Sequence, residues 1–365
     1  MKITAAVARQ AKAPFAIEEL DIDEPRGKEI RVRVLGVGVC HTDIISRDQQ
    51  IPVQLPAVLG HEGAGIVESV GSEVSKVAPG DKVVMSFLSC GHCPSCASSS
   101  PSYCHEFAPL NFLGRRPDGS PGLRSGAEEV SGRFFGQSSF ASHAIVEESN
   151  VVKVDVDEVS LPLLGALGCG FQTGAGSIMN SLACQPGENL VIVGGGAVGM
   201  SAVLAGAICE TNTVLIELNE SRRALAIELG AKAALDGNDP DFLEQLAAAL
   251  PGGVNKVFDT TGIGSVIEKF IGLLAPRGMV GLVAAAAADT KVALDVTQLV
   301  IRGITVKGIL EGDSHPDVFI PKLVEHFKAG RFPVEKISKT FPLDNINQAI
   351  DEQKTSAFVK AVLLP

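Results

Sequence analysis

Three glycines, Gly194, Gly196 and Gly199, follow an apolar run and constrain the fold of this chain more than any other feature. The run at residues 190–193 has the length and composition of a buried strand, and a helix-forming segment follows Gly199. In such a strand–turn–helix unit the first glycine permits a tight turn, the second lets the backbone approach a pyrophosphate, and the third lets helix and strand pack closely. The helix N-terminus then faces the phosphates. The pattern therefore predicts a dinucleotide-binding unit.

Short apolar runs alternate with segments of helical length through the second half of the chain. The apolar runs lie at residues 189–193, 213–217, 256–258, 279–284 and 305–309, and the helical segments at 197–209, 221–230 and 242–250. Strands that alternate with helices pair in parallel, with helices on both faces of the sheet. The sequence therefore predicts an α/β fold built on a doubly wound parallel sheet of the Rossmann type.

The first part of the chain has a different pattern. Residues 30–34 alternate between apolar and basic side chains, which is typical of a half-buried strand. Residues 60–153 are rich in glycine, proline and serine, with short β-like pieces at 65–67 and 82–85. A further apolar strand is expected at 358–364. Because 365 residues correspond to about two domains, we expect an irregular β-rich domain in addition to the α/β domain.

Glu217 lies 18 residues beyond Gly199, at the end of the next apolar run. A carboxylate at this position accepts hydrogen bonds from the adenosine ribose hydroxyls and repels the 2′-phosphate of NADP, so the sequence favours NAD. Arg222 and Arg223 follow closely, and an arginine there can neutralise a 2′-phosphate. The strictness of the preference for NAD therefore stays open, as does the simpler interpretation of Glu217 as a solvated strand-end residue.

The charge of the chain limits its partners. Acidic residues number 42 and basic residues 31, which gives a formal net charge of −11. An acidic chain repels phosphate backbones, so we expect no nucleic-acid partner. We also expect no membrane partner, because the sequence contains no apolar stretch of about 18 residues and its first residues lack the apolar core of a signal peptide. A cytoplasmic location is expected, where cysteines stay reduced and serve as metal ligands more often than as disulfides.

Four cysteines, Cys90, Cys93, Cys96 and Cys104, form the pattern C-x2-C-x2-C-x7-C. Four clustered thiolates suit a closed tetrahedral zinc site. The alternative is an iron–sulfur cluster, but the bacterial ferredoxin run has three residues before its fourth cysteine and then a proline. Here the gap is seven residues and His105 follows, so zinc is favoured. Because a closed site leaves no position for a substrate, we expect this zinc to be structural.

Cys40, His61 and Cys169 are also of metal-ligand type, and each lies in a suggestive local setting. Two cysteines and one histidine with an open fourth position are one of the arrangements found for catalytic zinc. The three residues are far apart in sequence, however, so spacing alone cannot show that they meet. A single cysteine is more often a small buried apolar residue, and a single histidine more often has a structural role.

The motifs in combination resemble the zinc-dependent medium-chain alcohol dehydrogenases over essentially the whole chain, and most of all the aryl (benzyl) alcohol dehydrogenases. The family motifs lie at residues 40–43, 60–63, 65, 71, 80–83, 90–104, 168–170 and 194–199, and those of the aryl subfamily at 47–49, 55–63, 137–141 and 168–176. The resemblance implies a GroES-like catalytic domain formed by residues 1–170 and 311–365, which carries the structural zinc lobe. It implies a Rossmann domain formed by residues 171–310.

The resemblance also implies the roles of individual residues at the metal. Cys40, His61 and Cys169 match the ligands of the catalytic zinc, and the four cysteines between 90 and 104 match those of the structural zinc. Thr42 matches the hydroxyl residue that hydrogen-bonds the alcohol oxygen. Asp43 matches the carboxylate that orients the ligand histidine, and Glu62 a carboxylate behind the metal.

Further residues match positions at the cofactor and the substrate. His41 and Lys360 match basic residues on the cofactor pyrophosphate, although arginine is more common than lysine at the second position. Thr173 and Val203 match positions near the nicotinamide. The pocket for the alcohol is expected to include Phe140 and either Ser86 or Phe87.

One position departs from the pattern of many family members. They carry a histidine three residues beyond the Thr42 position, where it ends a proton relay through the cofactor ribose, and this chain has Ile45 there. An isoleucine in this pocket cannot carry a proton, so the relay must leave through the ribose to water or to another base. The aryl alcohol dehydrogenases resemble this chain in having an apolar residue at that position.

The expected function is the reversible, NAD-dependent oxidation of primary aromatic or allylic alcohols to aldehydes, with two Zn²⁺ ions per subunit. The expected partners are a small alcohol or aldehyde and further copies of the chain, as a homodimer or homotetramer. Three alternatives remain: a glutathione-dependent formaldehyde dehydrogenase, a zinc-free quinone or enone reductase, and a non-catalytic cofactor-binding protein. Of the eight cysteines, Cys184 and Cys209 are left without a metal role and are expected to be buried helix or loop residues.

Overall fold

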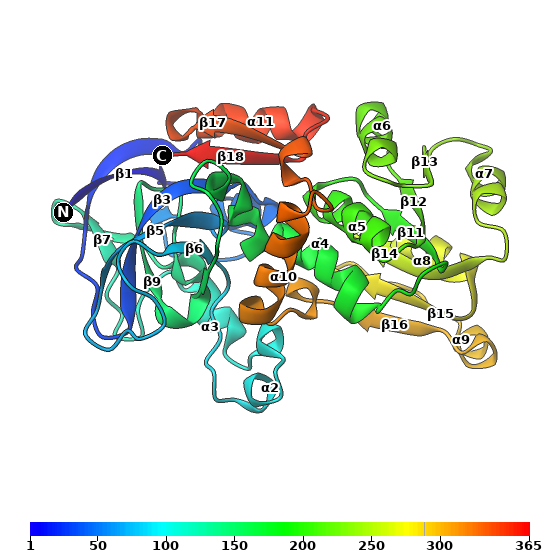
Figure 1. Cartoon of the computed structure of the whole chain (residues 1–365), viewed down its shortest axis with the longest axis horizontal. Helices are drawn as coiled ribbons and strands as arrows, with labels where there is room; N and C mark the ends of the chain where they lie inside the picture. The colour runs from blue at the N-terminus through cyan, green and yellow to red at the C-terminus, as the bar shows by residue number, and fades with distance from the viewer. Residues whose placement is uncertain (288) are drawn as a thin grey trace. The chain divides into compact units, whose positions relative to one another are not determined.

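The computed structural model describes residues 1–287 and 289–365. Its contacts divide the chain into two compact units (Figure 1). The first unit contains Met1–Gly170, His315–Lys354 and Lys360–Pro365, and the second contains Phe171–Ser314 and Thr355–Val359. Among the described residues, no helix is both long enough and apolar enough to cross a membrane.

The second unit contains a parallel sheet. Its strands are β11 (Asn189–Val193), β12 (Asn212–Ile216), β13 (Ala233–Leu235), β14 (Val254–Asp259), β15 (Leu274–Leu282) and β16 (Thr305–Gly308). They pair in parallel in the spatial order β13-β12-β11-β14-β15-β16. This is the strand order of a doubly wound dinucleotide-binding fold, which confirms the predicted α/β class.

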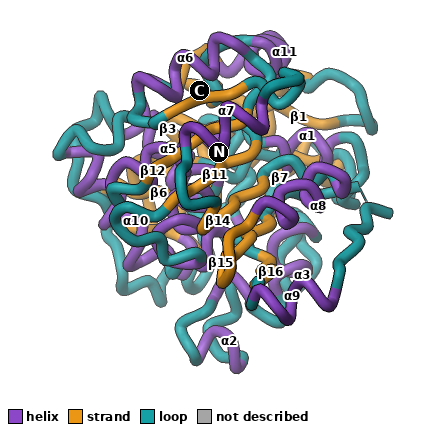
Figure 2. Tube along the Cα trace, turned by 90° about the vertical axis from the view of Figure 1, so that its right-hand side faces the viewer, coloured by secondary structure: helices purple, strands orange, loops and turns teal. Residues whose placement is uncertain are grey.

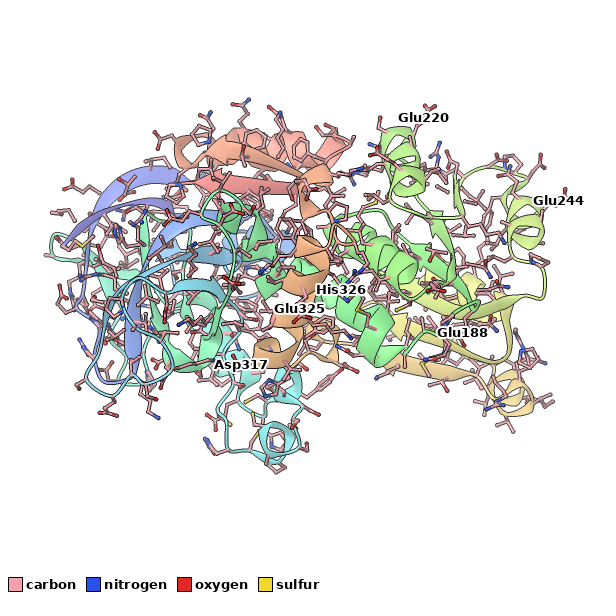
Figure 3. The ribbon with its side chains drawn as sticks, viewed as in Figure 1. Glu188, Glu220, Glu244, Asp317, Glu325 and His326 are labelled. Atoms are coloured by element: carbon pink, nitrogen blue, oxygen red, sulfur yellow. The ribbon has the colours of Figure 1, made fainter. Side chains whose placement is uncertain are left out.

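Helices connect these strands, and Figure 2 shows β14 and β15 side by side among them. The helices of this unit are α5 (Ala197–Ile208), α6 (Glu220–Glu228), α7 (Phe242–Ala249), α8 (Gly264–Leu273) and α9 (Val296–Arg302), preceded by α4 (Gly170–Gly176), whose first residue belongs to the first unit. Glu220 and Glu244 project from the first turns of α6 and α7 (Figure 3). Negative charge there complements the helix dipole.

The apolar strands explain why this sheet is buried. Every residue of β11 is buried, as expected for a strand covered on both faces. Val191 and Val214 pack in one cluster with Phe242 of α7 and Phe270 of α8, whose ring centroids lie 6.2 Å apart. Burial of each such side chain contributes about 1.5–3 kcal/mol.

The first unit is built mostly from antiparallel strands, with parallel pairing only between β17 and β18 and between β4 and β8 among the described residues. A closed barrel is formed by β1 (Lys2–Ala8), β2 (Ala16–Ile22), β7 (Gly122–Ser125), β8 (Glu128–Ser131) and β4 (Ala57–Val58). A second sheet has the order β10 (Val151–Lys153), β6 (Lys82–Met85), β5 (Gly63–Val70), β3 (Glu29–Gly38), β18 (Lys360–Leu364) and β17 (Ser338–Pro342), with β9 (His143–Glu147) also paired to β3. The helices are α1 (His41–Arg47), α2 (Pro94–Ala97), α3 (Phe107–Phe112), α10 (Pro316–Lys328) and α11 (Ile346–Thr355).

Strand β3 determines where the functional groups of this unit lie. It pairs with β5 and with the C-terminal strand β18, where Val362 faces Gly38. Cys40 follows the end of β3, His61 and Glu62 precede the start of β5, and Lys360 is the first residue of β18. Because β3 is antiparallel to β5 and to β18, these residues lie at one end of the sheet.

Candidate functional site

Four side chains of metal-ligand type converge in the first unit. They are Cys40, His61, Glu62 and Cys169, and their ligand atoms all lie within 4.8 Å of one another. Cys169 follows a 3-10 segment, Leu161–Gly168, so the four residues come from three distant parts of the chain. The structure therefore brings together the three residues whose meeting the sequence spacing could not establish.

Asp43 orients two members of this cluster. Its Oδ1 accepts a hydrogen bond from His61 Nδ1 at 2.8 Å and its Oδ2 accepts one from the Cys40 backbone N–H at 3.0 Å. Oδ1 also accepts the backbone N–H of Gly60 at 3.0 Å. Because a carboxylate can only accept, the Nδ1 atom of His61 carries the proton and its Nε2 atom keeps a lone pair for a metal.

The environment of His61 Nε2 fits a metal ligand. The side chain is fully buried, and within the described structure Nε2 has no hydrogen-bond partner. A buried nitrogen without a hydrogen-bond partner destabilises the folded protein by about 1–3 kcal/mol. Two sulfur atoms lie within 4.8 Å of it, and two thiolates with one imidazole are a donor set that suits zinc.

The protonation states of Cys40 and His61 depend on each other. A hydrogen bond from Cys169, supported by the charge of His61, lowers the pKa of the Cys40 thiol well below its usual range despite burial. Burial alone lowers the pKa of His61, but the charges of Asp43 and Cys40 outweigh it and raise the pKa of the ring well above its usual value. A proton therefore competes with a metal for the imidazole, and metal affinity falls as the pH falls.

Glu62, the fourth member of the cluster, forms a buried ion pair with Lys360. Its Oε2 lies 2.6 Å from Lys360 Nζ, and its Oε1 accepts the backbone N–H of Gly170 at 3.0 Å. Burial raises the pKa of the Glu62 carboxyl, against the opposing charge of Lys360. Lys360 also donates to the Val39 carbonyl at 3.0 Å. The structure thus gives the ammonium group of Lys360 a partner that the sequence did not predict, and its contact with a cofactor phosphate stays a prediction.

Helix α1 carries the remaining groups expected beside the metal. The Thr42 hydroxyl lies 3.8 Å from Cys40 Sγ. Ile45 is buried and follows Thr42 by three residues, so the two side chains share one face of the helix. His41, the first residue of α1, is exposed and is accessible to a ligand.

Two aromatic rings that the sequence analysis did not single out contact the metal cluster. The ring of Phe135 stacks on the His61 imidazole with centroids 4.4 Å apart, and the ring of Phe134 approaches it edge-on at 5.6 Å. Phe135 has a φ of 50°, a left-handed conformation that is costly for a bulky residue. The signal in the sequence is the pair of phenylalanines one residue before the 137–141 motif, but it does not show which ring the histidine contacts.

The two phenylalanines predicted for the substrate pocket lie in different surroundings. Phe87 packs against Phe107 with centroids 5.7 Å apart. Phe140 is fully buried, and its ring packs edge-on against Phe15 at 5.7 Å, which places it in the core. The rings against His61 are those of Phe134 and Phe135, which we propose as further candidates for the pocket, and the predicted roles of Phe87 and Phe140 stay predictions.

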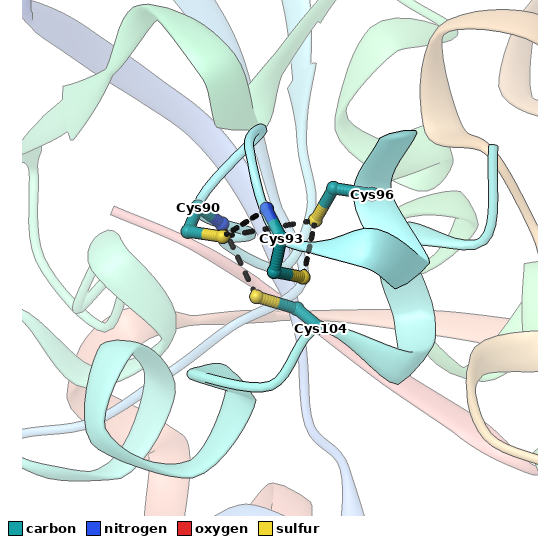
Figure 4. A group of neighbouring side chains, drawn as sticks. All are labelled: Cys90, Cys93, Cys96 and Cys104. Carbon is teal, nitrogen blue, oxygen red and sulfur yellow. Dashed lines mark hydrogen bonds between the residues drawn. The ribbon is translucent and has the colours of Figure 1, made fainter. Parts of the chain in front are cut away.

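The four-cysteine lobe forms a second metal-binding group (Figure 4). The sulfur atoms of Cys90, Cys93, Cys96 and Cys104 all lie within 4.8 Å of one another, as predicted from their spacing. Cys96 Sγ lies 3.6 Å from Cys93 Sγ and 4.0 Å from Cys90 Sγ. These separations exceed a disulfide bond, and every cysteine among the described residues is free.

Backbone N–H groups converge on the sulfurs of this lobe. The amide of His105 donates to Cys93 Sγ at 3.5 Å, and the amide of Glu106 donates to Cys104 Sγ at 3.4 Å. The bond from His105 contributes most to lowering the pKa of Cys93 to about 6, whereas burial raises the pKa of Cys104 to about 12. N–H groups directed at thiolates are typical of zinc–cysteine sites, where they stabilise the negative sulfur.

The glycine turn of the second unit has the geometry expected of a pyrophosphate cradle. Gly194 has a φ of 96°, and a Cβ atom on Gly199 would lie 1.9 Å from the Gly194 carbonyl oxygen, so neither position accepts a side chain. A Cβ atom on Gly196 would meet open space. Gly196 is the N-cap of α5, so the free N–H groups of that helix start at the open side of the turn.

Glu217 lies beside this turn. Its carboxylate accepts the backbone N–H of Gly195 at 2.6 Å and that of Asn219 at 2.8 Å. Arg222 donates to the Ser356 carbonyl at 3.0 Å, and Arg223 donates to the Glu217 carbonyl at 2.8 Å. The negative charge, rather than either guanidinium group, is therefore held against the glycine turn.

The structure does not support the predicted role of Val203. Val203 is fully buried in the second turn of α5, so it has no surface to offer a cofactor. Val198, in the first turn, is partly exposed, and its carbonyl oxygen lies against Gly174, next to Thr173. We therefore propose Val198 in place of Val203. Thr173 itself is mostly buried, and its hydroxyl donates to Glu311 at 3.3 Å.

Both units of the chain are similar to known proteins. The family model "Alcohol dehydrogenase GroES-like domain" matches residues 26–156, and the model "Zinc-binding dehydrogenase" matches residues 184–328. A geraniol dehydrogenase of Castellaniella defragrans is 46% identical over 363 residues, which cover 99% of this chain and 97% of the relative.

Two solved structures are similar over nearly their whole length. An alcohol dehydrogenase zinc-binding domain protein from Burkholderia ambifaria has a TM-score of 0.97 and 47% identity, covering 100% of this chain and 99% of that one. The benzyl alcohol dehydrogenase of Acinetobacter calcoaceticus has a TM-score of 0.95 and 39% identity, with the same coverage.

Proposed function

The chain belongs to the zinc-dependent medium-chain alcohol dehydrogenase family, and we propose that it oxidises primary aromatic or allylic alcohols to aldehydes with NAD. As a member of this family it is an oxidoreductase that acts on alcohols and uses zinc and a nicotinamide dinucleotide. The observation that carries the proposal is the buried cluster of Cys40, His61 and Cys169, whose imidazole presents an unpartnered Nε2 atom.

The substrate class rests on the relatives and on the rings at the cluster. One relative is named a geraniol dehydrogenase, which acts on an allylic alcohol, and a structural neighbour is a benzyl alcohol dehydrogenase. Phe134 and Phe135 are buried and place two aromatic rings beside His61. Flat, unsaturated substrates pack well against such rings, with a gain of about 0.5–1.5 kcal/mol per aromatic pair beyond the burial of area.

The preference for NAD rests on Glu217. Its carboxylate is fixed at the glycine turn by two backbone N–H groups, where the ribose of a bound dinucleotide is expected. The 2′-phosphate of NADP would bring a second negative charge to the same place. NADP is therefore expected to bind more weakly than NAD, as a comparison of their dissociation constants would show.

The residues of the first unit supply the metal site and the proton path. Cys40, His61 and Cys169 would hold a zinc ion, which would lower the pKa of a bound alcohol hydroxyl, and a bound NAD would take up the hydride. Thr42, whose hydroxyl lies 3.8 Å from Cys40 Sγ, accepts the proton of the alcohol and passes its own proton on. Asp43 holds the His61 ring so that Nε2 faces the cluster. The fully buried surroundings of His61 exclude water.

The two units divide these tasks. The proposed metal ligands, Thr42 and Asp43 belong to the first unit, whereas the glycine turn and Glu217 belong to the second. We therefore propose that the first is the catalytic domain and the second the cofactor domain. The boundaries expected from the sequence differ from the contact-based units at residues 311–314 and 355–359, which have their contacts in the second unit.

Assays on an alcohol panel test the proposed function. The purified protein with zinc and NAD should reduce NAD, followed by its absorbance, with benzyl, cinnamyl or terpene alcohols giving a kcat/KM at least about tenfold above that of ethanol. A preference for short aliphatic alcohols would overturn the proposed substrate class. Activity only with formaldehyde and glutathione together would support the glutathione-dependent alternative instead.

Substitution of Ile45→His should alter the dependence of the rate on pH. Ile45 lies on the same face of α1 as Thr42 and carries no proton. A histidine there would accept the relayed proton when its ring is neutral, that is, above its pKa of about 6.5. We expect kcat near pH 7 to rise about tenfold, with the gain lost below pH 6. Ile45→Val is the matched control, and identical pH–rate profiles for both variants would contradict the relay.

We further propose that the chain forms a homo-oligomer through the second unit. Helix α9 has no buried residue among those described, and Val296, Val300 and Ile301 on it are 70–75% exposed. It lies next in sequence to β16, the edge strand of the sheet. Exposed apolar side chains beside a sheet edge favour association. Light scattering of the purified protein should give a mass of at least twice 38.0 kDa.

A further inference from the structure

A strained turn follows β16 in the second unit. Glu311, Gly312 and Asp313 have φ values of 51°, 66° and 51°, so three successive residues adopt the left-handed conformation and two of them are not glycine. Each such residue costs about 1–3 kcal/mol, and the strain persists only where the surroundings impose it. Lys307 helps to hold the turn in this conformation, because its Nζ lies 2.6 Å from Asp313 Oδ2.

Close packing fixes this turn against α4. A Cβ atom on Gly312 would lie 2.5 Å from the Gln172 carbonyl oxygen and 2.9 Å from that of Thr173. A Cβ atom on Gly176 would in turn lie 2.4 Å from the Gly312 carbonyl oxygen. The two backbones therefore touch where both residues are glycine, and the turn cannot shift without displacing α4.

The packing directs the carboxylate of Glu311 toward α4. Its Oε2 accepts hydrogen bonds from Gln172 Nε2 and from Thr173 Oγ1, each at 3.3 Å. Only 6% of the Glu311 surface is exposed. The carboxyl group is thus held inside the unit by groups that lie 138 and 139 residues away in sequence.

The turn lies at the carboxyl edge of the parallel sheet, where dinucleotides bind. A row of hydrogen bonds marks this edge, because the residue after each strand donates its N–H to the last residue of the neighbouring strand. The bonds run from Glu217 to Leu235, Gly194 to Ile216, Thr260 to Val193, Val283 to Asp259 and Ile309 to Leu282, at 2.9–3.2 Å. Glu311 follows two residues after the last donor of this row.

The position in the row indicates which half of a dinucleotide lies near Glu311. The ribose carboxylate Glu217 and the pyrophosphate turn at Gly194 follow β12 and β11. A dinucleotide that lies across the edge from β12 to β11 continues over β14, β15 and β16. Its nicotinamide half therefore reaches the part of the edge that Thr173 and Glu311 share.

We propose that Glu311 is a positioning residue of the cofactor site, which holds Gln172 and Thr173 in place and through its charge favours the oxidised over the reduced nicotinamide. The proposal rests on the NAD-dependent activity proposed above. The nicotinamide ring carries a positive charge when oxidised and none when reduced, so a nearby buried carboxylate attracts only the oxidised form. This difference in affinity between the two forms favours release of the reduced cofactor after the alcohol is oxidised.

Glu311→Gln tests the charge, because glutamine keeps the size of the side chain and an acceptor oxygen. The dissociation constant of NAD⁺ is measured by calorimetry and that of NADH by its fluorescence, on the full chain with zinc. We expect NAD⁺ to bind about tenfold more weakly, equivalent to about 1.4 kcal/mol, and NADH to change by less than about twofold. Glu311→Asp, which keeps the charge, should retain the wild-type ratio of the two constants.

Asp313→Asn is the matched control, because it neutralises a carboxylate on the same turn that pairs with Lys307. This variant should leave the ratio of the two dissociation constants unchanged. Equal weakening of NAD⁺ and NADH in Glu311→Gln, or an unchanged ratio, would overturn the inference. Where Glu311→Gln does not fold, Glu311→Met provides the neutral variant, and failure of both to fold would assign Glu311 a structural role only. If the wild-type protein binds neither cofactor form, the proposed function itself fails.

Discussion

Replacement of Cys40 by alanine is expected to lower kcat/KM for the preferred alcohol by about 10³- to 10⁴-fold, because Lewis acidity at the reacting oxygen contributes several kcal/mol. Cys40 lies within 4.8 Å of the other ligand atoms of the cluster, and Asp43 fixes its backbone. Its loss leaves one thiol and one imidazole, too few to retain zinc firmly. Zinc measured by mass spectrometry should therefore fall from about two ions per chain to about one.

The matched control for this experiment is Cys209→Ala. Cys209 is the C-cap residue of α5 and belongs to neither group of candidate metal ligands. The control should keep both zinc ions and the activity of the unmodified protein. Full turnover by Cys40→Ala with one zinc ion lost would show that the cluster around His61 is not the catalytic centre. Loss of both zinc ions would indicate unfolding, which the thermal transition would reveal.

Local patterns in the sequence predicted the parts of the fold and site that depend on neighbours in the chain. The glycines at 194, 196 and 199 stand within six residues, so their turn is determined by one strand and one helix. The cysteines at 90 and 104 are separated by 14 residues, and one loop brings all four sulfurs together. The alternation of strands and helices likewise predicted the parallel sheet, because parallel pairing requires such crossovers.

The contacts that the sequence did not reveal join distant segments. Phe135 stacks on His61 across 74 residues, and Lys360 pairs with Glu62 across almost the whole chain. Neither pair has a characteristic spacing, because each depends on how β5, β18 and the preceding loops pack. Resemblance to a family indicated that Cys40, His61 and Cys169 belong together and that Asp43 and Glu62 support them, but it did not identify Phe135 as a contact of His61.

Helix phase explains why we propose Val198 rather than Val203 as the contact of the cofactor. Val198 and Val203 are five residues apart on α5, which corresponds to a rotation of about 140° around the helix axis. The two side chains therefore point to nearly opposite sides, and only Val198 is partly exposed. A position on the first turn beside the glycines has the exposure that contact with a cofactor requires.

The part of the four-cysteine lobe around α2 is exposed, which makes it dependent on its metal. Helix α2, which contains Cys96, has no buried residue. Asn111 joins the ends of the lobe, because its side chain accepts the Leu88 N–H at 2.9 Å and donates to the Leu88 carbonyl at 3.0 Å. Between these ends, a zinc ion would stabilise the sulfurs and the N–H groups directed at them.

Cys96→Ser is therefore expected to release the zinc of the lobe and to open residues 88–111 locally. Loss of a structural metal costs on the order of 4 kcal/mol, so the amides of His105 and Glu106 should exchange with solvent about 10³-fold faster. Hydrogen exchange followed by mass spectrometry measures this, with Cys209→Ser as the control that keeps slow exchange. The Cys40–His61–Cys169 cluster shares no ligand with the lobe, so the second zinc ion should remain bound. Unchanged exchange after verified loss of one zinc ion would contradict a structural role, since the lobe would then be held by its protein contacts alone.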